Sequence, residues 1–177
     1  GLVVGEDGDL SAQFLKAGWR MFQLEQPMAT HDLNMTSAKQ YWKRNYRTGY
    51  GFAVLASRHG WKCQFFLRDI VKRVLIRGGG GLLAILAGLI IVACGWLIAG
   101  LALVLFGVLA IVNPRLLRTR KLMDELDLTR REARLYGWHC SVSIIPQFFG
   151  FCRFFVGEIC GNPLRNRRLQ TNPEPAI

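Results

Sequence analysis

The strongest pattern in the sequence is a run of uncharged, mostly apolar residues from position 82 to position 112. A single straight helix of that length would reach roughly 45 Å, which exceeds the ~30 Å hydrocarbon core of a bilayer. A break at residues 94–96 would divide the run into two helices that are each near the lower limit for crossing. The pattern therefore predicts a transmembrane helical hairpin over residues 78–113.

Positively charged residues stand on both sides of this run and none lies inside it; they are Lys72, Arg73, Arg77, Arg115, Arg118, Arg120 and Lys121. Cytoplasmic loops are enriched in Lys and Arg, and an even number of crossings returns the chain to the side where it started. We therefore expect both ends of the hairpin to face the cytoplasm. The alternative, a buried core hairpin of a soluble protein, is disfavoured because helices without a polar face are typical of membranes.

Two segments before the hairpin combine an apolar stripe with cations and aromatic side chains. Residues 36–58 follow the period of a helix that Thr36 or Ser37 would cap, and residues 63–77 follow the same period more briefly. Helices of this kind favour the headgroup layer of a membrane. We expect amphipathic interfacial helices over residues 37–77, after which the glycines at 78–81 would let the chain turn into the bilayer.

The segments after the hairpin are also predicted to be helical for most of their length. Residues 114–136 are highly charged and are expected to form a cytoplasmic helical connector, with a helix capped by Thr129. Residues 137–161 are apolar and rich in Phe, with interruptions at Pro146, Arg153 and Glu158. These interruptions favour an interfacial or re-entrant helix over a third crossing. Residues 162–177 have the composition of a disordered basic tail.

The net charge of +11 raises the question of a nucleic-acid partner. Most of the excess lies between residues 39 and 77, beside the hairpin and interleaved with aromatic residues. That arrangement favours contact with membrane lipids or with an anionic substrate at the bilayer surface, and no nucleic-acid partner is expected. The five cysteines include no C-x-x-C pair, so neither a disulfide framework nor a zinc site is indicated.

Residues 1–36 carry most of the candidate chemistry. Glu6, Asp7 and Asp9 stand at the start of a predicted short helix, which Asp9 would cap and Gly18 would end. Alternation over residues 20–24 predicts a short strand, and residues 1–4 also have the composition of a strand. The sequence begins inside that predicted strand, without an initiator Met or a leader, and we expect it to be the C-terminal piece of a longer protein.

Several short motifs follow one another along the first 60 residues. They are GEDGDL at 5–10, AGW at 17–19, HDLNMT at 31–36, QYWKR at 40–44, RTGY at 47–50 and HG at 59–60. This order resembles the acceptor half of family 2 glycosyltransferases with a GT-A fold, in a bacterial membrane-bound branch. The resemblance implies that residues 1–36 are the C-terminal, acceptor-side remnant of an α/β GT-A catalytic domain. The fragment as a whole is then expected to be mainly α.

The resemblance also implies an activity. Enzymes of this family transfer a sugar, with inversion, from a nucleotide-sugar donor to an acceptor. Here the acceptor would be lipid-linked or a polysaccharide, at the cytoplasmic face of the bacterial inner membrane. The position that matches the family's general base is Asp7, with Glu6 beside it. A base is needed because an acceptor hydroxyl is a poor nucleophile until its proton is removed.

Further residues are implied as ligands of the substrate or of a metal. Asp9, Trp42, Lys43 and Arg44 are the substrate-binding candidates, and His31 matches a position near the diphosphate and its divalent cation, Mg²⁺ or Mn²⁺. We expect the Asp-x-Asp ligands of that cation, and the nucleotide-binding half, to precede residue 1, so that this fragment alone would be inactive. The Gln-x-x-Arg-Trp motif of processive relatives is not intact, because Trp42 precedes the cations, and this favours single transfer.

An alternative from a different class is a non-catalytic basic membrane hairpin protein. Its basic flanks would bind anionic lipid or a partner protein. The acidic residues at the start would then only favour the N-terminal end of a helix dipole. The sequence leaves both interpretations open.

Overall fold

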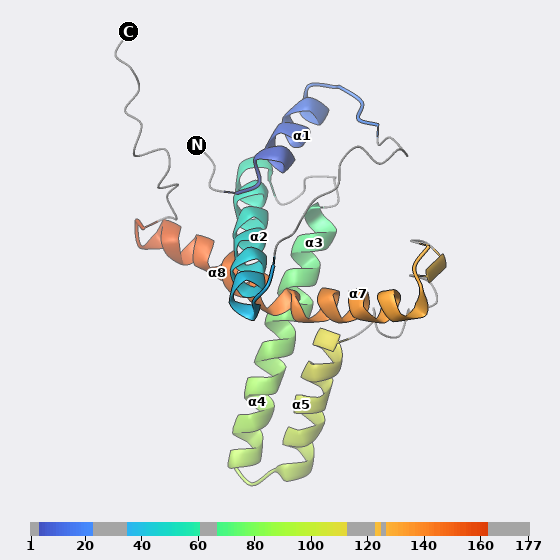
Figure 1. Ribbon diagram of the computed structural model, residues 1–177. Helices are drawn as coiled ribbons and strands as arrows, with labels where there is room; N and C mark the ends of the chain where they lie inside the picture. Colours follow the sequence, from blue (N-terminus) through green and yellow to red (C-terminus); the bar gives the residue numbers. More distant parts are fainter. Residues whose placement is uncertain (1–3, 23–34, 61–66, 113–122, 125–126, 163–177) are drawn as a thin grey trace.

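The computed structural model describes residues 4–22, 35–60, 67–112, 123–124 and 127–162. Its helices are α1 (Glu6–Lys16), α2 (Ala38–His59), α3 (Leu67–Arg73), the π-helix η1 (Val74–Gly80), α4 (Gly81–Ala93), α5 (Leu97–Val112), α7 (Arg130–Val142) and α8 (Ile144–Ile159). The described residues contain no strand, so the predicted mainly α class is confirmed for them. Figure 1 shows an α4–α5 hairpin that projects from a group of helices formed by α1, α2, α3, α7 and α8.

Helix α1 begins earlier than the sequence pattern predicted. Its N-cap is Gly5, with a φ of +90°, so the predicted cap at Asp9 is wrong. Glu6, Asp7 and Asp9 all lie in the first turn, where carboxylates interact favourably with the positive end of the helix dipole. The predicted stop at Gly18 is confirmed, because its φ of +85° is a backbone conformation that glycine adopts without strain.

The strand predicted over residues 20–24 is not formed by residues 20–22, the part of it that the structure describes. A strand needs a neighbour to pair with its backbone N–H and C=O groups, and the described residues offer none. Instead the guanidinium of Arg20 lies 5.5 Å from the centre of the Phe22 ring. Residues 1–3 and 163–177, which carry the other predicted strand and nearly all of the predicted basic tail, lie outside the described residues.

Helix α2 has the bounds that its sequence predicted. The Ser37 side chain accepts a hydrogen bond from the Gln40 backbone N–H at 3.2 Å, and the Gln40 side chain accepts one from the Ser37 N–H at 3.2 Å. This reciprocal capping box satisfies two backbone donors that would otherwise lack partners. The helix ends at His59, followed by Gly60 with a φ of +85°.

The predicted turn at residues 78–81 is wrong, because the chain stays helical from α3 through η1 into α4. The glycines serve close packing against α8 instead. A Cβ atom on Gly78 would lie 3.0 Å from the Cβ of Phe148, and one on Gly79 would lie 2.6 Å from the Phe148 ring. Glycine at these positions lets the wide π-helical turn and α8 approach each other without moving either backbone.

The break predicted near residues 94–96 is confirmed, since α4 ends at Ala93, Gly95 has a φ of +92° and α5 begins at Leu97. The two helices then pack through glycine. A Cβ on Gly88 would lie 2.7 Å from the carbonyl oxygen of Gly100, and one on Gly107 would lie 2.6 Å from that of Gly81. Because the two glycines of each helix are two turns apart, they share one face, and the backbones touch along the hairpin.

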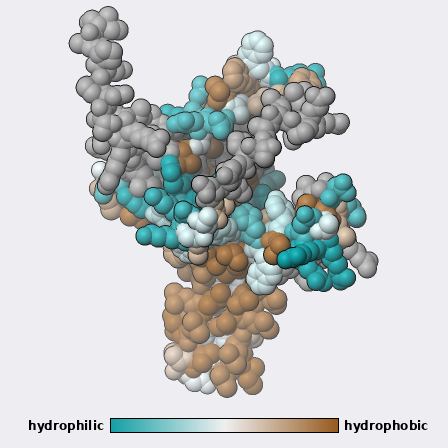
Figure 2. Space-filling model, in the orientation of Figure 1, coloured by the Kyte–Doolittle hydropathy of each residue, from teal (hydrophilic) through white to brown (hydrophobic). Residues whose placement is uncertain are grey.

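Within the described ranges, two helices are long and apolar enough to cross a membrane by length and composition, and they are Arg68–Ala93 and Arg130–Ile159. The second hairpin helix, Leu97–Val112, is shorter and reaches about 24 Å. Figure 2 shows hydrophobic side chains covering the visible surface of the hairpin, with hydrophilic ones gathered over the other helices. In Figure 1 the α7–α8 run lies transverse to the hairpin, so the two cannot both follow one membrane normal.

Helices α2 and α8 cross through a second set of glycines. Gly49 of α2 contacts the backbone of Gln147, and Gly150 of α8 contacts the carbonyl oxygen of Tyr46. Beside this crossing the rings of Tyr50 and Phe154 meet edge to face, with their centres 5.5 Å apart. The core cluster is built around these helices and consists of Tyr50, Ala53, Leu55, Ala56, Val71, Val74, Ile111, Ile144, Phe151 and Phe154.

Helix α7 begins at the cap that the sequence predicted. The Thr129 hydroxyl accepts from the Glu132 backbone N–H at 3.3 Å, and the Glu132 carboxylate accepts from the Thr129 N–H at 2.9 Å. The Thr129 hydroxyl also donates to this carboxylate at 2.6 Å, and that bond, together with the one from the Thr129 N–H, holds the pKa of the Glu132 carboxyl below its ordinary value. The Ser141 hydroxyl donates to the carbonyl oxygen of Val112 at 3.1 Å, which ties α7 to the end of the hairpin.

We predict that Gly100→Ala lowers the free energy of unfolding by about 1–3 kcal/mol, because its Cβ would lie 2.6 Å from the carbonyl oxygen of Gly88 in the α4 backbone. Gly80→Ala is the matched control, since the nearest atom to its new Cβ, the Leu75 carbonyl oxygen, lies 4.0 Å away. Thermal unfolding in detergent micelles, followed by circular dichroism, measures both. Equal melting of the two variants would contradict glycine-mediated packing of the hairpin.

Candidate functional site

The start of α1 rests on the end of α2, and glycines allow the close approach. A Cβ on Gly8 would lie 2.9 Å from a methyl carbon of Leu55, and one on Gly51 would lie 3.1 Å from a methyl carbon of Val4. We call Glu6, Asp7 and Asp9, together with the neighbouring end of α2, the acidic corner. It contains the predicted catalytic residues.

Asp9 is the buried member of the acidic corner, with 6% of its surface exposed. One carboxylate oxygen accepts hydrogen bonds from the Arg58 guanidinium at 2.9 Å and from the Gln13 amide at 2.8 Å. The other lies 2.7 Å from Nε2 of His59. The carboxylate therefore links the first turn of α1 to the last turn of α2.

These contacts set the charge of Asp9. Burial alone would raise the pKa of its carboxyl group, but the hydrogen bonds from His59, Gln13 and Arg58 outweigh burial and lower that pKa from the ordinary 3.8. Asp9 is thus a charged structural link at neutral pH. Its two oxygens are already engaged, which leaves the predicted substrate-binding role of Asp9 without support from the geometry.

Glu6 and Asp7 differ from Asp9 because both are exposed. They lie in the first turn of α1, beside a carboxylate that is held in place by Arg58 and His59. An exposed carboxylate on an anchored helix end can accept a proton from a bound hydroxyl group. The geometry is compatible with the predicted role of Asp7.

The predicted substrate-binding residues Trp42, Lys43 and Arg44 are exposed on the first half of α2. Trp42 packs against the Phe149 ring, with ring centres 6.2 Å apart. Arg44 stands before Leu55, the α2 residue beneath Gly8, by a rise of roughly 16 Å along the helix. The structure therefore does not bring these three residues together with the acidic corner.

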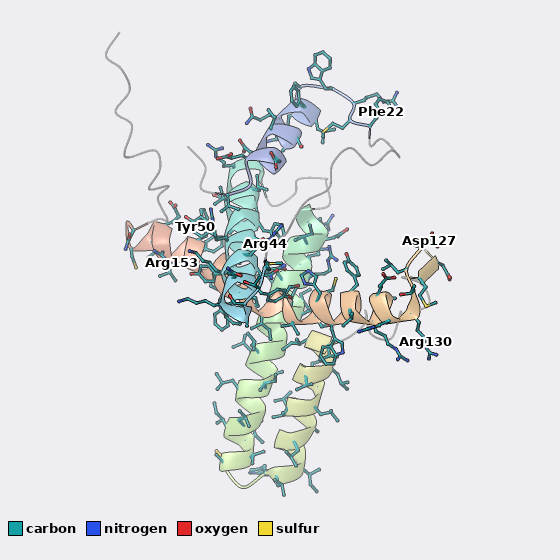
Figure 3. All side chains as sticks on the ribbon, viewed as in Figure 1. Phe22, Arg44, Tyr50, Asp127, Arg130 and Arg153 are labelled. Atoms are coloured by element: carbon teal, nitrogen blue, oxygen red, sulfur yellow. The ribbon has the colours of Figure 1, made fainter. Side chains whose placement is uncertain are left out.

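Figure 3 shows that other labelled side chains also lie far apart from one another. Arg44 lies over the middle of α2, whereas Phe22 lies beyond the end of α1. Asp127 and Arg130 lie at the start of α7, away from the α2–α8 crossing where Tyr50 and Arg153 are found. The labelled residues thus lie in separate regions: beyond α1, on α2, at the start of α7 and at the α2–α8 crossing.

The divalent cation implied by the resemblance finds no donor set in the described part of the chain. No group of three His, Cys, Asp or Glu residues is placed there to hold a metal ion. Asp9 is already hydrogen-bonded to cationic or amide groups, and His31 lies outside the described residues. Among the described residues, Glu6 and Asp7 alone do not make a metal site.

Arg58 and His59 are the site residues that sequence reasoning missed. The sequence indicated His59 only as part of the HG motif at 59–60, and in the structure it is the last residue of α2. Their contact with Asp9 joins residues 49 and 50 positions apart, and no local spacing signals such a pairing. The Nδ1 atom of His59 is buried and has no hydrogen-bond partner, which leaves the bond to Asp9 as the contact that orients the ring.

Comparison with known proteins gives no further information on the site. No protein-family model, no curated protein and no solved structure matches the chain.

We predict that Asp9→Asn lowers the free energy of unfolding by about 1–2 kcal/mol, because the amide loses the charge that holds His59 and Arg58, whose side chain is half exposed and partly screened by solvent. Asp7→Asn is the matched control, since this exposed carboxylate lies in the same turn. Urea unfolding in detergent micelles measures both. A loss as large in Asp7→Asn would contradict the assigned contacts.

The unmodified chain and Asp9→Asn can also be compared as a function of pH. The folded-state pKa of Asp9 is depressed, so its contribution is fully present above about pH 3.8 and is lost as the pH falls through the lower folded value. Below pH 4 the unmodified chain should therefore lose stability more steeply than Asp9→Asn. Parallel acid profiles would contradict the lowered pKa.

Proposed function

We propose that this chain is the acceptor-side and membrane-anchoring part of a glycosyltransferase, with Asp7 as the general base. The observation that carries the proposal is that the three acids of the acidic corner differ in exposure and in hydrogen bonding. Asp9 is bound to Arg58, Gln13 and His59, and this leaves Asp7 and Glu6 exposed on an anchored helix end. The motif resemblance supplies the reaction class, a sugar transfer from a nucleotide-sugar donor with inversion.

The proposed step balances without any further reactant. The acceptor hydroxyl oxygen forms a bond to the anomeric carbon while the bond from that carbon to the nucleotide diphosphate breaks. The hydroxyl proton passes to the carboxylate of Asp7. Glu6 is the neighbouring exposed carboxylate. The donor site would be supplied by residues outside this sequence.

The proposed location is a membrane surface, with the α4–α5 hairpin embedded in lipid. Support comes from the uncovered apolar surface of the hairpin and from the cations Lys72, Arg73 and Arg77 at its base. If the hairpin follows the membrane normal, the transverse α7–α8 run lies along the interface. The acidic corner and both ends of the hairpin would then be cytoplasmic, at a bacterial inner membrane.

This placement restricts the acceptor. Leu55, beside the acidic corner, lies roughly 14 Å along α2 from Tyr46, where α8 crosses that helix. An acceptor hydroxyl at Asp7 must therefore extend above the interfacial helix. A glycan that projects from a membrane lipid, or a polysaccharide, meets this requirement.

We predict that Asp7→Asn, made in the longer protein that this proposal implies, reduces sugar transfer by at least about 100-fold while donor affinity stays within about twofold, because only proton removal is lost. Radiolabelled sugar incorporation and calorimetric titration with the donor measure the two quantities. Glu158→Gln is the control, since this exposed acid lies at the end of α8. Retained turnover in Asp7→Asn would remove Asp7 from the role of base.

A hairpin embedded in the membrane predicts which side of the membrane the residues before and after it face. In a background with the other cysteines replaced by serine, Cys160 alone and Ser57→Cys alone should react with an impermeant maleimide from the same side of sealed vesicles. Both positions are exposed, one after α8 and one near the end of α2. Labelling of the two from opposite sides would contradict a hairpin that is followed by an interfacial α7–α8 run.

A non-catalytic membrane hairpin protein remains the second candidate. The observation in its favour is that Arg73 and Arg77 line a cavity near the base of the hairpin. The DNA 5′ of the codon for Gly1 separates the two candidates. A long open frame with an Asp-x-Asp motif supports the enzyme, and a start codon directly before Gly1 supports the alternative.

A further inference from the structure

A cavity of about 280 Å³ lies where the hairpin meets the other helices. Its walls come from α2, from α3 with η1, and from the α7–α8 run, so residues far apart in the sequence build it. The polar residues that line it are Arg73, Arg77, Tyr136, His139, Ser143 and Gln147. None of the described residues that line it is an aspartate or a glutamate, so the two arginines give this lining a positive potential.

The two arginines come from one side of the cavity, at the junction of α3 and η1. Arg77 is held in place, because its guanidinium donates to the carbonyl oxygens of Ala110 at 3.2 Å and of Ile111 at 2.8 Å. These carbonyls belong to the last turn of α5, so Arg77 also marks the base of the apolar hairpin. Arg73 stands four residues earlier, and its Nε donates to the Asp69 carbonyl oxygen at 3.2 Å.

The opposite wall supplies neutral hydrogen-bonding groups. Tyr136, His139 and Ser143 recur at helical spacing along α7 and its junction with α8. The His139 ring is positioned by Tyr41, whose hydroxyl lies 2.9 Å from Nδ1. Hydroxyl and imidazole groups that face guanidinium groups are a typical environment for the oxygens of a phosphate.

The size and place of the cavity restrict its ligand further. A volume of about 280 Å³ lies at the lower end of the range for small-molecule pockets, roughly 300–1,000 Å³. It has room for a headgroup but not for long acyl chains. Directly below Arg77 begins the exposed apolar surface of the hairpin, which includes Leu83, Leu86 and Leu109, each more than half exposed. Acyl chains outside the cavity could lie against that surface.

We propose that this cavity binds the phosphate headgroup of an anionic membrane lipid, with Arg73 and Arg77 as the phosphate ligands and the acyl chains lying along the α4–α5 hairpin. The site rests on the membrane location proposed above but not on sugar transfer. It differs from a diffuse basic surface because two arginines and several neutral hydrogen-bonding residues line one half-open cavity. It would fix the depth at which the transverse helices sit on the bilayer.

The test uses the whole chain in neutral detergent micelles and native mass spectrometry. The probes are phosphatidic acid, phosphatidylcholine with the same acyl chains, and inorganic phosphate. We expect one phosphatidic acid molecule to bind per chain, at least about tenfold more tightly than either other probe. Arg73→Gln should weaken this binding about tenfold, because one charge-assisted contact is lost.

Lys72→Gln is the matched control, since it removes the same charge from the adjacent, exposed residue, which does not line the cavity. Its affinity should stay within about twofold. An equal loss in both variants would overturn the site in favour of diffuse attraction. Equal binding of inorganic phosphate, or of phosphatidylcholine, would overturn the assignment to an anionic lipid.

One further variant distinguishes the proposed lipid site from the proposed sugar transfer. Asp7→Asn should bind phosphatidic acid as tightly as the unmodified chain, because the acidic corner takes no part in the cavity. Loss of sugar transfer in Asp7→Asn of the longer protein, with lipid binding by the Asp7→Asn chain intact, supports both proposals. Weak, non-selective lipid binding by the unmodified chain would overturn the cavity alone.

Discussion

Direct backbone contact between helices, made possible by glycine, is the constraint on which the structure depends. In the hairpin Gly88 and Gly100 face each other's carbonyl oxygens, and at the α2–α8 crossing Gly49 and Gly150 do the same with Gln147 and Tyr46. At such distances a Cβ atom has no room, so almost any other residue would force the helices apart. The crossing fixes α8 against α2, and Gly78 and Gly79 fix it against η1. The angle between the hairpin and the transverse helices follows from these contacts, and so does the cavity between them.

Charged residues have different environments at the two ends of α2. At its C-terminal end a buried carboxylate, Asp9, satisfies Arg58 and His59 and docks α1. A buried charge is stable only when it is paired in this way, and the pairing leaves the neighbouring acids exposed to solvent. At the N-terminal end of α2 the cations are exposed and lie near α7 and α8. Most of the length of α2 thus separates these exposed cations from the proposed chemistry at the acidic corner.

The base of the hairpin is where the polar and apolar parts of the molecule meet. Arg77 joins them, because it caps the last carbonyls of α5 and also lines the cavity above. A guanidinium group suits this position, since it carries several donors in a fixed plane and holds its charge at any physiological pH. The proposed lipid site is therefore a consequence of how η1 and α5 are joined. The proposed glycosyl transfer depends on a different surface.

Local sequence signals predicted much of the secondary structure. The capping boxes at Ser37 and Thr129, the stop at Gly18 and the break near residues 94–96 are set by neighbouring residues, and all four are present in the structure. Two predictions that used local signals were wrong for a tertiary reason. The glycines at 78–81 do not turn the chain, because packing against Phe148 keeps them helical, and the described part of residues 20–24 has no strand partner.

The sequence by itself determined where the chain is apolar, where it is charged and where most of its helices begin and end, because those properties depend on residues close together in the chain. Only the tertiary structure decided which acid is buried, which cations share a cavity and how α8 lies across α2. Those outcomes depend on contacts between residues such as Asp9 and His59, which are 50 positions apart. No periodicity or spacing in the sequence encodes a contact at that separation, because it exists only after the helices have packed.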